Sequence, residues 1–331
     1  MKILVTGATG LLGSERTRQL VADGADVRIL RRATSKLDLL GDVADQVEHA
    51  VGDVNDVERL QAAMADVRQV YHVATFVGFG GRRDRERLRR VNVVGTANVV
   101  NAALAAGVER LVHTSSMAAF GRPEDATQTI DETSEWRASR MNTAYAESKY
   151  LAELEVFRGI AEGLDAVIVN PALIFGLGRP GEGTMQIAQQ VRDGRLPAVP
   201  TGGTNVVDVI DVAAGHRLAM ARGETGERYF LGSENLTWRA IIGTLAEAFG
   251  VAPPRRTLSP TLALTAGTLA EAFAFVTGSR PRLTRETART ASRFYRYSNQ
   301  KAIEELGCSF RPFEETALRM AQGLGNGAVP H

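Results

Sequence analysis

The stretch TGATGLLG, residues 6–13, decides the fold of this chain. It follows a short apolar run at residues 2–6 (KILVT) and leads into an amphipathic segment at residues 11–22, which indicates a strand, a tight turn and a helix. In such a turn the first glycine allows the sharp bend, the second lets the backbone approach a pyrophosphate, and the third lets helix and strand pack closely. Free N–H groups at the helix start attract phosphate. We therefore expect a dinucleotide site formed by Gly7, Thr9, Gly10, Leu11, Leu12 and Gly13.

The rest of the first half repeats this alternation. Helical patterns lie near residues 55–65, 84–106 and 142–162, between apolar strand patterns at 26–30, 46–51, 68–74, 110–115 and 165–170. Strands separated by helices predict βαβ crossovers and a parallel sheet. The predicted fold class is α/β, a Rossmann-like doubly wound parallel sheet with a smaller mixed α/β C-terminal substrate lobe. We place the dinucleotide domain at residues 1–175 and the substrate lobe at 176–331, with a return of the chain near 205–222.

Composition excludes several classes of protein. The 331 residues are 44% hydrophobic and 23% charged, with a net charge of +1, which argues against intrinsic disorder and against a broad nucleic-acid surface. The single cysteine, Cys308, rules out an internal disulfide and fits a reducing compartment. No secretory pattern is visible at the start, so we expect a cytoplasmic protein. No group of residues has metal-ligand spacing, and we expect no metal.

Two stretches could mislead. Residues 258–277 are apolar, but Pro260 and Glu271 interrupt them, so we expect a buried or groove-lining helix and no membrane span. Residues 82–90 (RRDRERLRR) contain many arginines together with Asp84 and Glu86. We interpret them as a solvated helix face, and the alternative is an anion-attracting rim beside the site.

The end of the second strand bears on the choice of nucleotide. NAD sites place an acidic residue there to bind the ribose hydroxyls, whereas this chain has Arg31 and Arg32. A guanidinium pairs well with a 2′-phosphate, so NADP(H) is favoured and NAD(H) remains the alternative. The competing interpretation is that Arg31 is an ordinary surface arginine.

A second constellation follows the fifth strand. Tyr145 and Lys149 stand four residues apart in YAESK (145–149), on one face of a helix. A lysine there would lower the pKa of the phenol, so that the tyrosine can exchange a proton with a carbonyl or alcohol oxygen. The strand at 110–115 ends in Thr114, Ser115 and Ser116, at the sheet edge where ligands bind in open α/β folds. A serine hydroxyl at this edge can polarise the same carbonyl.

Together these motifs resemble those of the extended short-chain dehydrogenases/reductases, in the NAD-dependent epimerase/dehydratase family. Within that family the chain is most similar to dihydroflavonol-4-reductase-like and hopanoid-associated bacterial members. The resemblance covers nearly the whole chain and rests on TGATGLLG (6–13), GDV (52–54), HVAT (72–75), NVVGT (92–96), TSSMAAFG (114–121), YAESK (145–149) and NPALIFG (170–176).

The resemblance implies roles for individual residues. Tyr145 would be the proton donor or acceptor, Lys149 its partner, and Ser116, rather than Ser115, the hydroxyl that orients the carbonyl. Asn92 would shape the active site, with a packing or capping asparagine as the alternative. His72 and His113 lie within strand patterns and are expected to be packed. The remaining cofactor contacts, besides those of Arg31, Arg32, Tyr145 and Lys149, would come from Asp53, Val54, Val73, Ala74, Thr75, Thr114, Pro171 and Ile174.

Three functions stay open at this stage. The first is an NADP(H)-dependent reductase of a ketone or aldehyde on a bulky, fairly apolar small molecule, favoured by Arg31, by Thr75 and by apolar residues such as Met185, Phe273 and Phe275. The second is a nucleotide-sugar epimerase or dehydratase with tightly bound NAD(P). The third is a non-enzymatic redox-sensing module. The family likeness also suggests a homodimer through the helices near 84–106 and 142–162.

Overall fold

The computed structural model describes residues 1–78, 81–123, 125, 127–139, 141–277 and 284–325, without the side chains of 82 and 272–277. Its centre is a seven-stranded sheet with the strand order β11-β7-β5-β4-β1-β2-β3, and all six strand pairs are parallel. The strands are β1 (Lys2–Thr6), β2 (Asp26–Arg31), β3 (Glu48–Val51), β4 (Val67–His72), β5 (Arg110–Thr114), β7 (Ala166–Pro171) and β11 (Arg228–Leu231).

This strand order reverses direction between β1 and β4, because β2 and β3 lie on one side of β1 and β4, β5 and β7 follow on the other. In open α/β sheets, ligands bind beyond the carboxyl ends of the strands at such a reversal. The predicted doubly wound sheet is confirmed, and its reversal brings the ends of β1 and β4 together.

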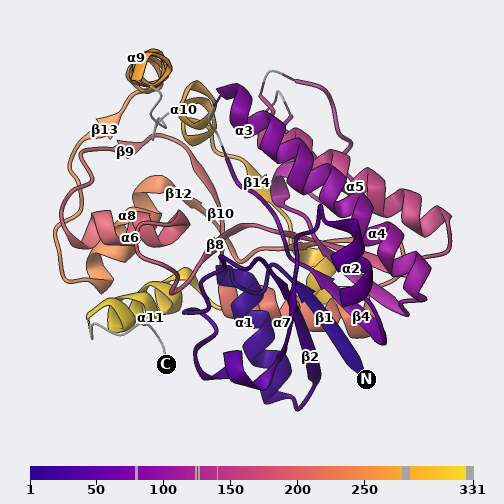
Figure 1. Ribbon diagram of the computed structural model, residues 1–331. Coiled ribbons are helices and arrows are strands. Elements are labelled where there is room, and N and C mark those ends of the chain that lie inside the picture. The colour runs from indigo at the N-terminus through magenta and orange to yellow at the C-terminus, as the bar shows by residue number, and fades with distance from the viewer. Residues whose placement is uncertain (79–80, 124, 126, 140, 278–283, 326–331) are drawn as a thin grey trace.

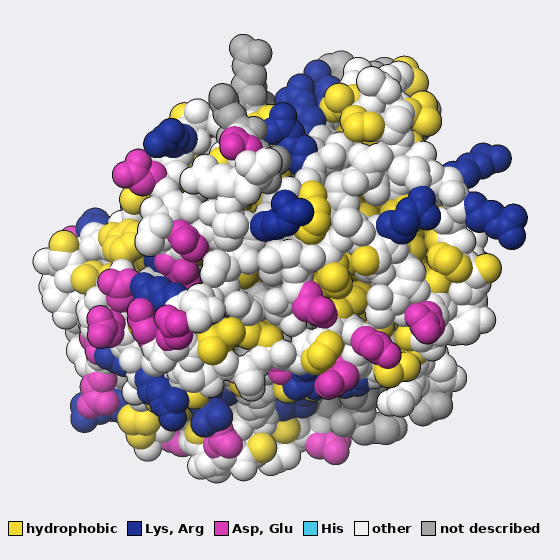
Figure 2. Space-filling view, turned by 180° about the vertical axis from the view of Figure 1, so that it is seen from behind, with side chains coloured by type: hydrophobic (Ala, Val, Ile, Leu, Met, Phe, Trp, Pro, Cys, Tyr) yellow, Lys and Arg dark blue, Asp and Glu magenta, His cyan; other side chains and the backbone are white. Residues whose placement is uncertain are grey.

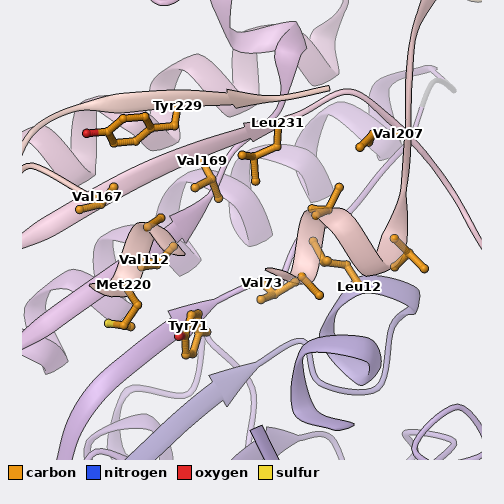
Figure 3. Close-up of a cluster of buried hydrophobic side chains, with 14 of the residues drawn as sticks. Leu12, Tyr71, Val73, Val112, Val167, Val169, Val207, Met220, Tyr229 and Leu231 are labelled. Carbon is orange, nitrogen blue, oxygen red and sulfur yellow. The ribbon is translucent and has the colours of Figure 1, made fainter. Parts of the chain in front are cut away.

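Helices cover both faces of the sheet (Figure 1). On one face, α1 and α7 pack on each other and on strand residues such as Val112, Val167 and Val169, as Figure 3 shows together with Leu12 and Met220. On the other face lie α2, α4 and α5, which pack on apolar residues of alternate register in the same strands. Strands buried on both faces are nearly continuous apolar runs. The helices are α1 (Leu11–Ala22), α2 (Val57–Ala63), α4 (Gly95–Ala106), α5 (Ala144–Ala161) and α7 (Val209–Arg222).

A smaller unit follows β7 and has its own apolar core. It contains a three-stranded sheet of β12, β10 and β8, helices α6, α8 and α11, and the neighbouring α9 and α10. From β10 the chain returns to the large sheet through α7 and β11, and the division at residue 175 remains a prediction. The elements are β8 (Leu173–Phe175), α6 (Gly183–Arg192), β9 (Val199–Pro200), β10 (Gly203–Asp208), β12 (Glu234–Thr237), α8 (Trp238–Ala248), β13 (Thr257–Leu258), α9 (Pro260–Thr277), α10 (Arg285–Ala291) and α11 (Phe313–Gly325), while β6 (Thr129–Ile130) pairs with β14 (Arg296–Tyr297).

The structure adds detail to one expected helix and differs from the expectation at another. The helix expected at 84–106 is divided into α3 (Gly81–Leu88), a π-helical turn (Arg89–Val94) and α4, and the turn holds the buried Asn92, whose side chain bonds outside its own helix. The apolar stretch at 258–277 is a helix, α9, but it lies at the surface, with Leu262 and Leu269 exposed by 58% and 66%. In the part of the chain that the structure describes, no helix is long and apolar enough to cross a membrane.

Candidate active site

The glycine loop has the geometry that a dinucleotide needs. Gly7 has φ +73°, and a Cβ there would lie 2.6 Å from the backbone nitrogen of Ala74; a Cβ on Gly13 would lie 2.1 Å from the Gly7 carbonyl oxygen. These two glycines are therefore required for close backbone packing. A Cβ on Gly10 would meet only the Gly7 carbonyl oxygen, at 3.5 Å, so it would extend into the space beside the start of α1. This open space next to a helix N-terminus fits a pyrophosphate.

One arginine that follows β8 bonds to this loop, and no local sequence pattern signals that role. Arg179 donates to the carbonyl of Thr9 at 2.9 Å and forms an ion pair with Asp38, which holds the pKa of that carboxyl below its ordinary value. The same guanidinium donates to the carbonyl of Lys36 at 3.1 Å. Arg179 thus ties the segment after β8 to the glycine loop and to the segment after β2.

The end of β2 carries the two arginines expected to select the nucleotide. The Nε of Arg31 donates to Nδ1 of His49 at 2.7 Å, which fixes a half-buried side chain, whereas Arg32 is exposed. Nearby, Asp53 accepts hydrogen bonds from the backbone and side chain of Asn55 at 3.0 and 2.8 Å, and Val54 is buried. These groups lie on one side of the loop, at the ends of β2 and β3.

The segment after β4 lies on the other side of β1 from the ends of β2 and β3. Val73 packs its side chain into the core, and the backbone N–H of Ala74 donates to the Thr6 hydroxyl at 3.2 Å. Thr75 is exposed and donates to Oδ1 of Asn92 at 3.1 Å. A cofactor contact by Val73 or Ala74 would therefore use backbone atoms.

Asn92 is buried, and both ends of its amide are bonded. Its Oδ1 accepts from the backbone N–H of Phe76 at 2.7 Å, and its Nδ2 donates to the Phe76 carbonyl and to Oγ of Ser148 at 2.9 and 3.0 Å. These bonds join the segment after β4 to helix α5, one residue before Lys149. The contacts favour a positioning role for Asn92.

Ser116 and Tyr145 are brought together at the carboxyl edge of the sheet. Ser116 begins a 3-10 turn (Met117–Phe120), and Tyr145 lies in the first turn of α5. Burial raises the pKa of the Tyr145 phenol, and a side-chain hydrogen bond with Ser116 opposes that shift. The neighbouring Ser115 is buried, with 5% exposed. The structure therefore gives the bond with Tyr145 to the expected serine.

Lys149 is almost wholly buried and bonded to the sheet. Its Nζ donates to the carbonyl of Thr114 at 2.8 Å, and its exposed fraction is 1%. Burial lowers the pKa of Lys149 to about 8, and the charge of Glu153 partly opposes this shift. The structure does not show the expected lowering of the Tyr145 pKa by Lys149, because burial of the phenol dominates.

Two further residues complete this end of the site and were missed from the sequence. Asn170 in β7 donates to the carboxylate of Glu153 at 2.6 Å and to the carbonyl of Ser116 at 3.0 Å. Glu153 is 1% exposed, and burial raises its pKa. The spacing offered a signal for Glu153, since it follows Lys149 by four residues on the same helix face.

The other predicted residues divide into two groups. Pro171 is buried at the end of β7, and Ile174 in β8 is half-buried, so both lie just beyond the Asn170 position. Met185, cited from the sequence as one of the apolar residues of the second lobe, belongs to the core of the smaller unit. The side chains of Phe273 and Phe275 lie outside the described residues.

The histidines are packed, as expected. His72 bonds with the hydroxyls of Thr6 and Thr96 at 2.8 and 3.0 Å, and burial lowers its pKa to about 3. His113 is fully buried, and burial holds its pKa well below the ordinary value. Among the described residues no group of three or more His, Cys, Asp or Glu side chains could hold a metal ion.

Comparison with known sequences bears on this geometry directly. The sequence profile of the NAD-dependent epimerase/dehydratase family matches residues 3–232. The chain belongs to that family. It is an NAD(P)-dependent oxidoreductase of the extended short-chain dehydrogenase/reductase type, and the recognition of this family from its motifs is confirmed.

Individual relatives agree with the reductase branch. A Synechocystis sp. protein, named provisionally as a dihydroflavonol 4-reductase, is 37% identical over 309 residues, which is 92% of this chain and 88% of the relative. A Stigmatella aurantiaca 4-hydroxy-2-methyl-3-oxo-4-farnesyl-3,4-dihydroquinoline-1-oxide ketoreductase is 31% identical over 344 residues, covering 100% and 99% of the two chains. The crystal structure of gox2253 is 36% identical with a TM-score of 0.84, covering 98% of each chain.

Proposed function

We propose that this protein is an NADP(H)-dependent reductase of a ketone or aldehyde on a bulky, fairly apolar small molecule. The observation that carries the proposal is the hydrogen bond between Ser116 and Tyr145 at the carboxyl end of β5, where the buried Lys149 bonds to the Thr114 carbonyl. Two reductase relatives, which cover this chain over at least nine-tenths of its length, support the reaction class.

The residues of the chain divide the reaction into separate tasks. The glycine loop and the start of α1 would hold the pyrophosphate, and Arg31 with Arg32 would face the adenosine end. When bound, the nicotinamide dinucleotide supplies the hydride. Ser116 orients the carbonyl oxygen of the substrate. Tyr145 delivers the proton of its phenolic hydroxyl to that oxygen.

Lys149 contributes a positive charge that favours the deprotonated form of Tyr145. Its ammonium is held against the Thr114 carbonyl, so its charge lies close to the base of the site without contacting solvent. A positive charge there favours the phenolate that remains after proton transfer. This contribution would be lost as the pH rises through the Lys149 pKa of about 8.

A carbonyl panel assayed in parallel with NADPH and NADH tests the proposal. We expect turnover of bulky aromatic or alicyclic ketones and aldehydes, with NADPH preferred. A purified protein that retains NAD(H), gives no net oxidation of added NADPH and interconverts nucleotide sugars would favour the epimerase or dehydratase alternative. Absence of turnover over the whole panel, with cofactor binding intact, would favour a redox-sensing module.

A further inference from the structure

Helix α9 presents an unusual surface for a helix in contact with water. Its 18 residues contain one charged side chain, Glu271, and that carboxylate is paired with Arg285 of α10 at 2.7 Å. Surface helices normally place charged and polar residues on the face away from the core. In α9 the outward face carries Leu262 and Leu269, exposed by 58% and 66%, with Thr265 between them.

The inward face of the same helix is already packed. Ala263 and Gly267 are buried, and a Cβ on Gly267 would lie 2.9 Å from the backbone of Thr284, at the start of α10. Residues 262, 265 and 269 follow each other at helical spacing on the opposite side. The exposed leucines are therefore not available to the core of the smaller unit.

The polar atoms on the outward face are satisfied within the helix. The hydroxyl of Thr265 donates to the carbonyl of Thr261 at 2.9 Å, and that of Thr268 donates to the carbonyl of Leu264 at 2.8 Å. Threonine that bonds back to its own helix needs no water and exposes its methyl group. The outward face of α9 can therefore leave water at little cost in hydrogen bonds.

Exposed arginines lie near this apolar face. Helix α10 lies against α9, and α3 is joined to α10 by the ion pair between Arg85 and Glu286 at 3.4 Å, so the three helices form one end of the molecule (Figure 1). Figure 2 views the molecule from behind, so α9 lies at the upper right. Apolar side chains gather there, and lysine and arginine side chains lie beside them. Arg255 and Arg256, just before α9, and Arg289 of α10 are exposed.

The charge of the sequence is concentrated in the same segments. Residues 82–90 carry six arginines and two acidic residues, and residues 255–289 also carry six and two, so each segment has a net charge of +4. Since the whole chain has +1, these two segments account for +8 and all other residues together for −7. The sequence therefore concentrates positive charge in α3 and in the segment that contains α9 and α10, and the remaining residues are net negative.

We propose that the outward face of α9 and its arginine rim dock onto an anionic lipid bilayer. An apolar helix face bordered by cations is the pattern of a helix that lies in the membrane interface, with the apolar face among the acyl chains and the cations at the headgroups. A second copy is disfavoured as occupant, because two positive ends would repel each other. A nucleic acid would match the charge but not the apolar face.

Vesicle flotation tests the proposal without any substrate. Wild-type protein should float with vesicles of equal parts phosphatidylglycerol and phosphatidylcholine, and not with phosphatidylcholine alone. About 1 M salt should weaken the binding, because the screening length falls to about 3 Å. The variant Leu262→Ser/Leu269→Ser and the variant Arg255→Ser/Arg256→Ser should each lower the vesicle partition coefficient by roughly tenfold or more.

A matched control lies on another helix. Leu318 of α11 is exposed by 46%, so Leu318→Ser makes the same chemical change outside the α9 face and should leave flotation unchanged. Circular dichroism and thermal melting should show that all variants fold. A wild type that ignores anionic vesicles, or a Leu262→Ser/Leu269→Ser variant that binds like wild type, would overturn the proposal. A lower oligomer mass for that variant in light scattering would assign the face to a second copy instead.

A second measurement does not depend on removing the leucines. The single cysteine of the chain, Cys308, is buried with 6% exposed, so a cysteine placed at 269 by Leu269→Cys can be labelled selectively with an environment-sensitive dye. Emission from that dye should shift to the blue on anionic vesicles, while the dye on a Leu318→Cys control should not respond. Equal responses from both positions would count against docking through α9.

Discussion

The two ends of the candidate active site are held by different kinds of contact. At the glycine loop, Gly7, Gly10 and Gly13 lie within one turn, and the distances that matter join backbone atoms of Gly7, Gly13 and Ala74. At the catalytic end, side chains bond across the sequence: Lys149 to a carbonyl 35 residues away, and Asn92 to a serine 56 residues away. The structure of the nucleotide end therefore depends on glycines, which have no side chain and let the backbone pack closely. The structure of the catalytic end depends on hydrogen bonds between buried polar groups.

This difference has an energetic consequence. Glycines chosen for close packing stabilise the folded loop, because any side chain would collide with the backbone. Buried Lys149 and Glu153 have shifted pKa values, which means that burial disfavours their charged forms. We expect changes at Gly7 and Gly13 to lower stability, and changes at the catalytic end to lower activity while keeping or raising stability.

The largest expected effect separates two glycines of one loop. Gly13→Val should prevent folding or lower the melting temperature sharply, since its Cβ would lie 2.1 Å from the Gly7 carbonyl oxygen. Gly10→Val should fold normally and lose cofactor affinity, because its Cβ extends into the space expected for the pyrophosphate. Thermal melting and fluorescence titration with NADPH measure the two effects.

The control for that pair is Gly243→Ala in α8. No atom lies within 4 Å of the added Cβ, so this change should raise the free energy of unfolding by up to about 1 kcal/mol. Normal NADPH binding by a folded Gly10→Val protein would contradict the role given to the loop.

The next effect tests proton transfer at the catalytic end. Tyr145→Phe should lower kcat by about 10²-fold or more and change NADPH affinity by no more than a few-fold. Ser116→Ala should also reduce kcat, since Ser116 shares a hydrogen bond with Tyr145, whereas the buried Ser115→Ala should be milder. Steady-state kinetics decide the order, and a stronger effect at Ser115 would mean that the serine assignment is shifted by one residue.

A third prediction concerns nucleotide choice. Charge-assisted bonds from a guanidinium to a 2′-phosphate contribute roughly 1.5–3 kcal/mol, so NADPH should exceed NADH by at least about tenfold in kcat/KM. Arg31→Asp should erase or reverse this preference, and Arg32→Asp should do less, because Arg31 is fixed by His49 and Arg32 is exposed. A wild type that prefers NADH, or unchanged discrimination in Arg31→Asp, would contradict the assignment.

The smallest effect is on stability. The pKa of Lys149 is about 8 in the folded protein, below its ordinary value of about 10.4, so the unfolded chain binds more protons between these pH values. Stability of the wild type should therefore rise with pH across that window as far as this group is concerned. Lys149→Met should abolish turnover and raise the free energy of unfolding at pH 7 by about 1–3 kcal/mol.

Urea unfolding at several pH values measures this gain, which should shrink as the pH rises from about 8 to about 10. A Lys149→Met variant less stable than wild type at pH 7 would show that the bond to the Thr114 carbonyl outweighs the cost of burial. The two ends of the site would then differ only in how far apart in the sequence the contacting residues are, and not in how they affect stability.

Prediction from sequence succeeded for features that depend on residues close together in the chain. The strand-turn-helix at residues 6–13 and the spacing of Tyr145 and Lys149 depend on neighbours within a few residues, and the structure and the family match agree with both. The sequence did not decide the surroundings of Met185, since an amphipathic helix can direct a methionine to a core or to a site. Prediction failed for α9, because hydrophobicity alone does not say whether a helix is covered.

The sequence by itself determined the family and the sheet and supplied the candidate residues for the chemistry, because glycine spacing and the short Tyr-Lys interval are properties of consecutive residues. The tertiary structure decided the surroundings. It paired Glu153 with Asn170, gave every polar atom of Asn92 a partner across the site, and joined Arg179 to the glycine loop. It also left the leucines of α9 outside the core. These outcomes depend on which distant segments become neighbours, since burial and hydrogen-bond partners are set only when the layers pack.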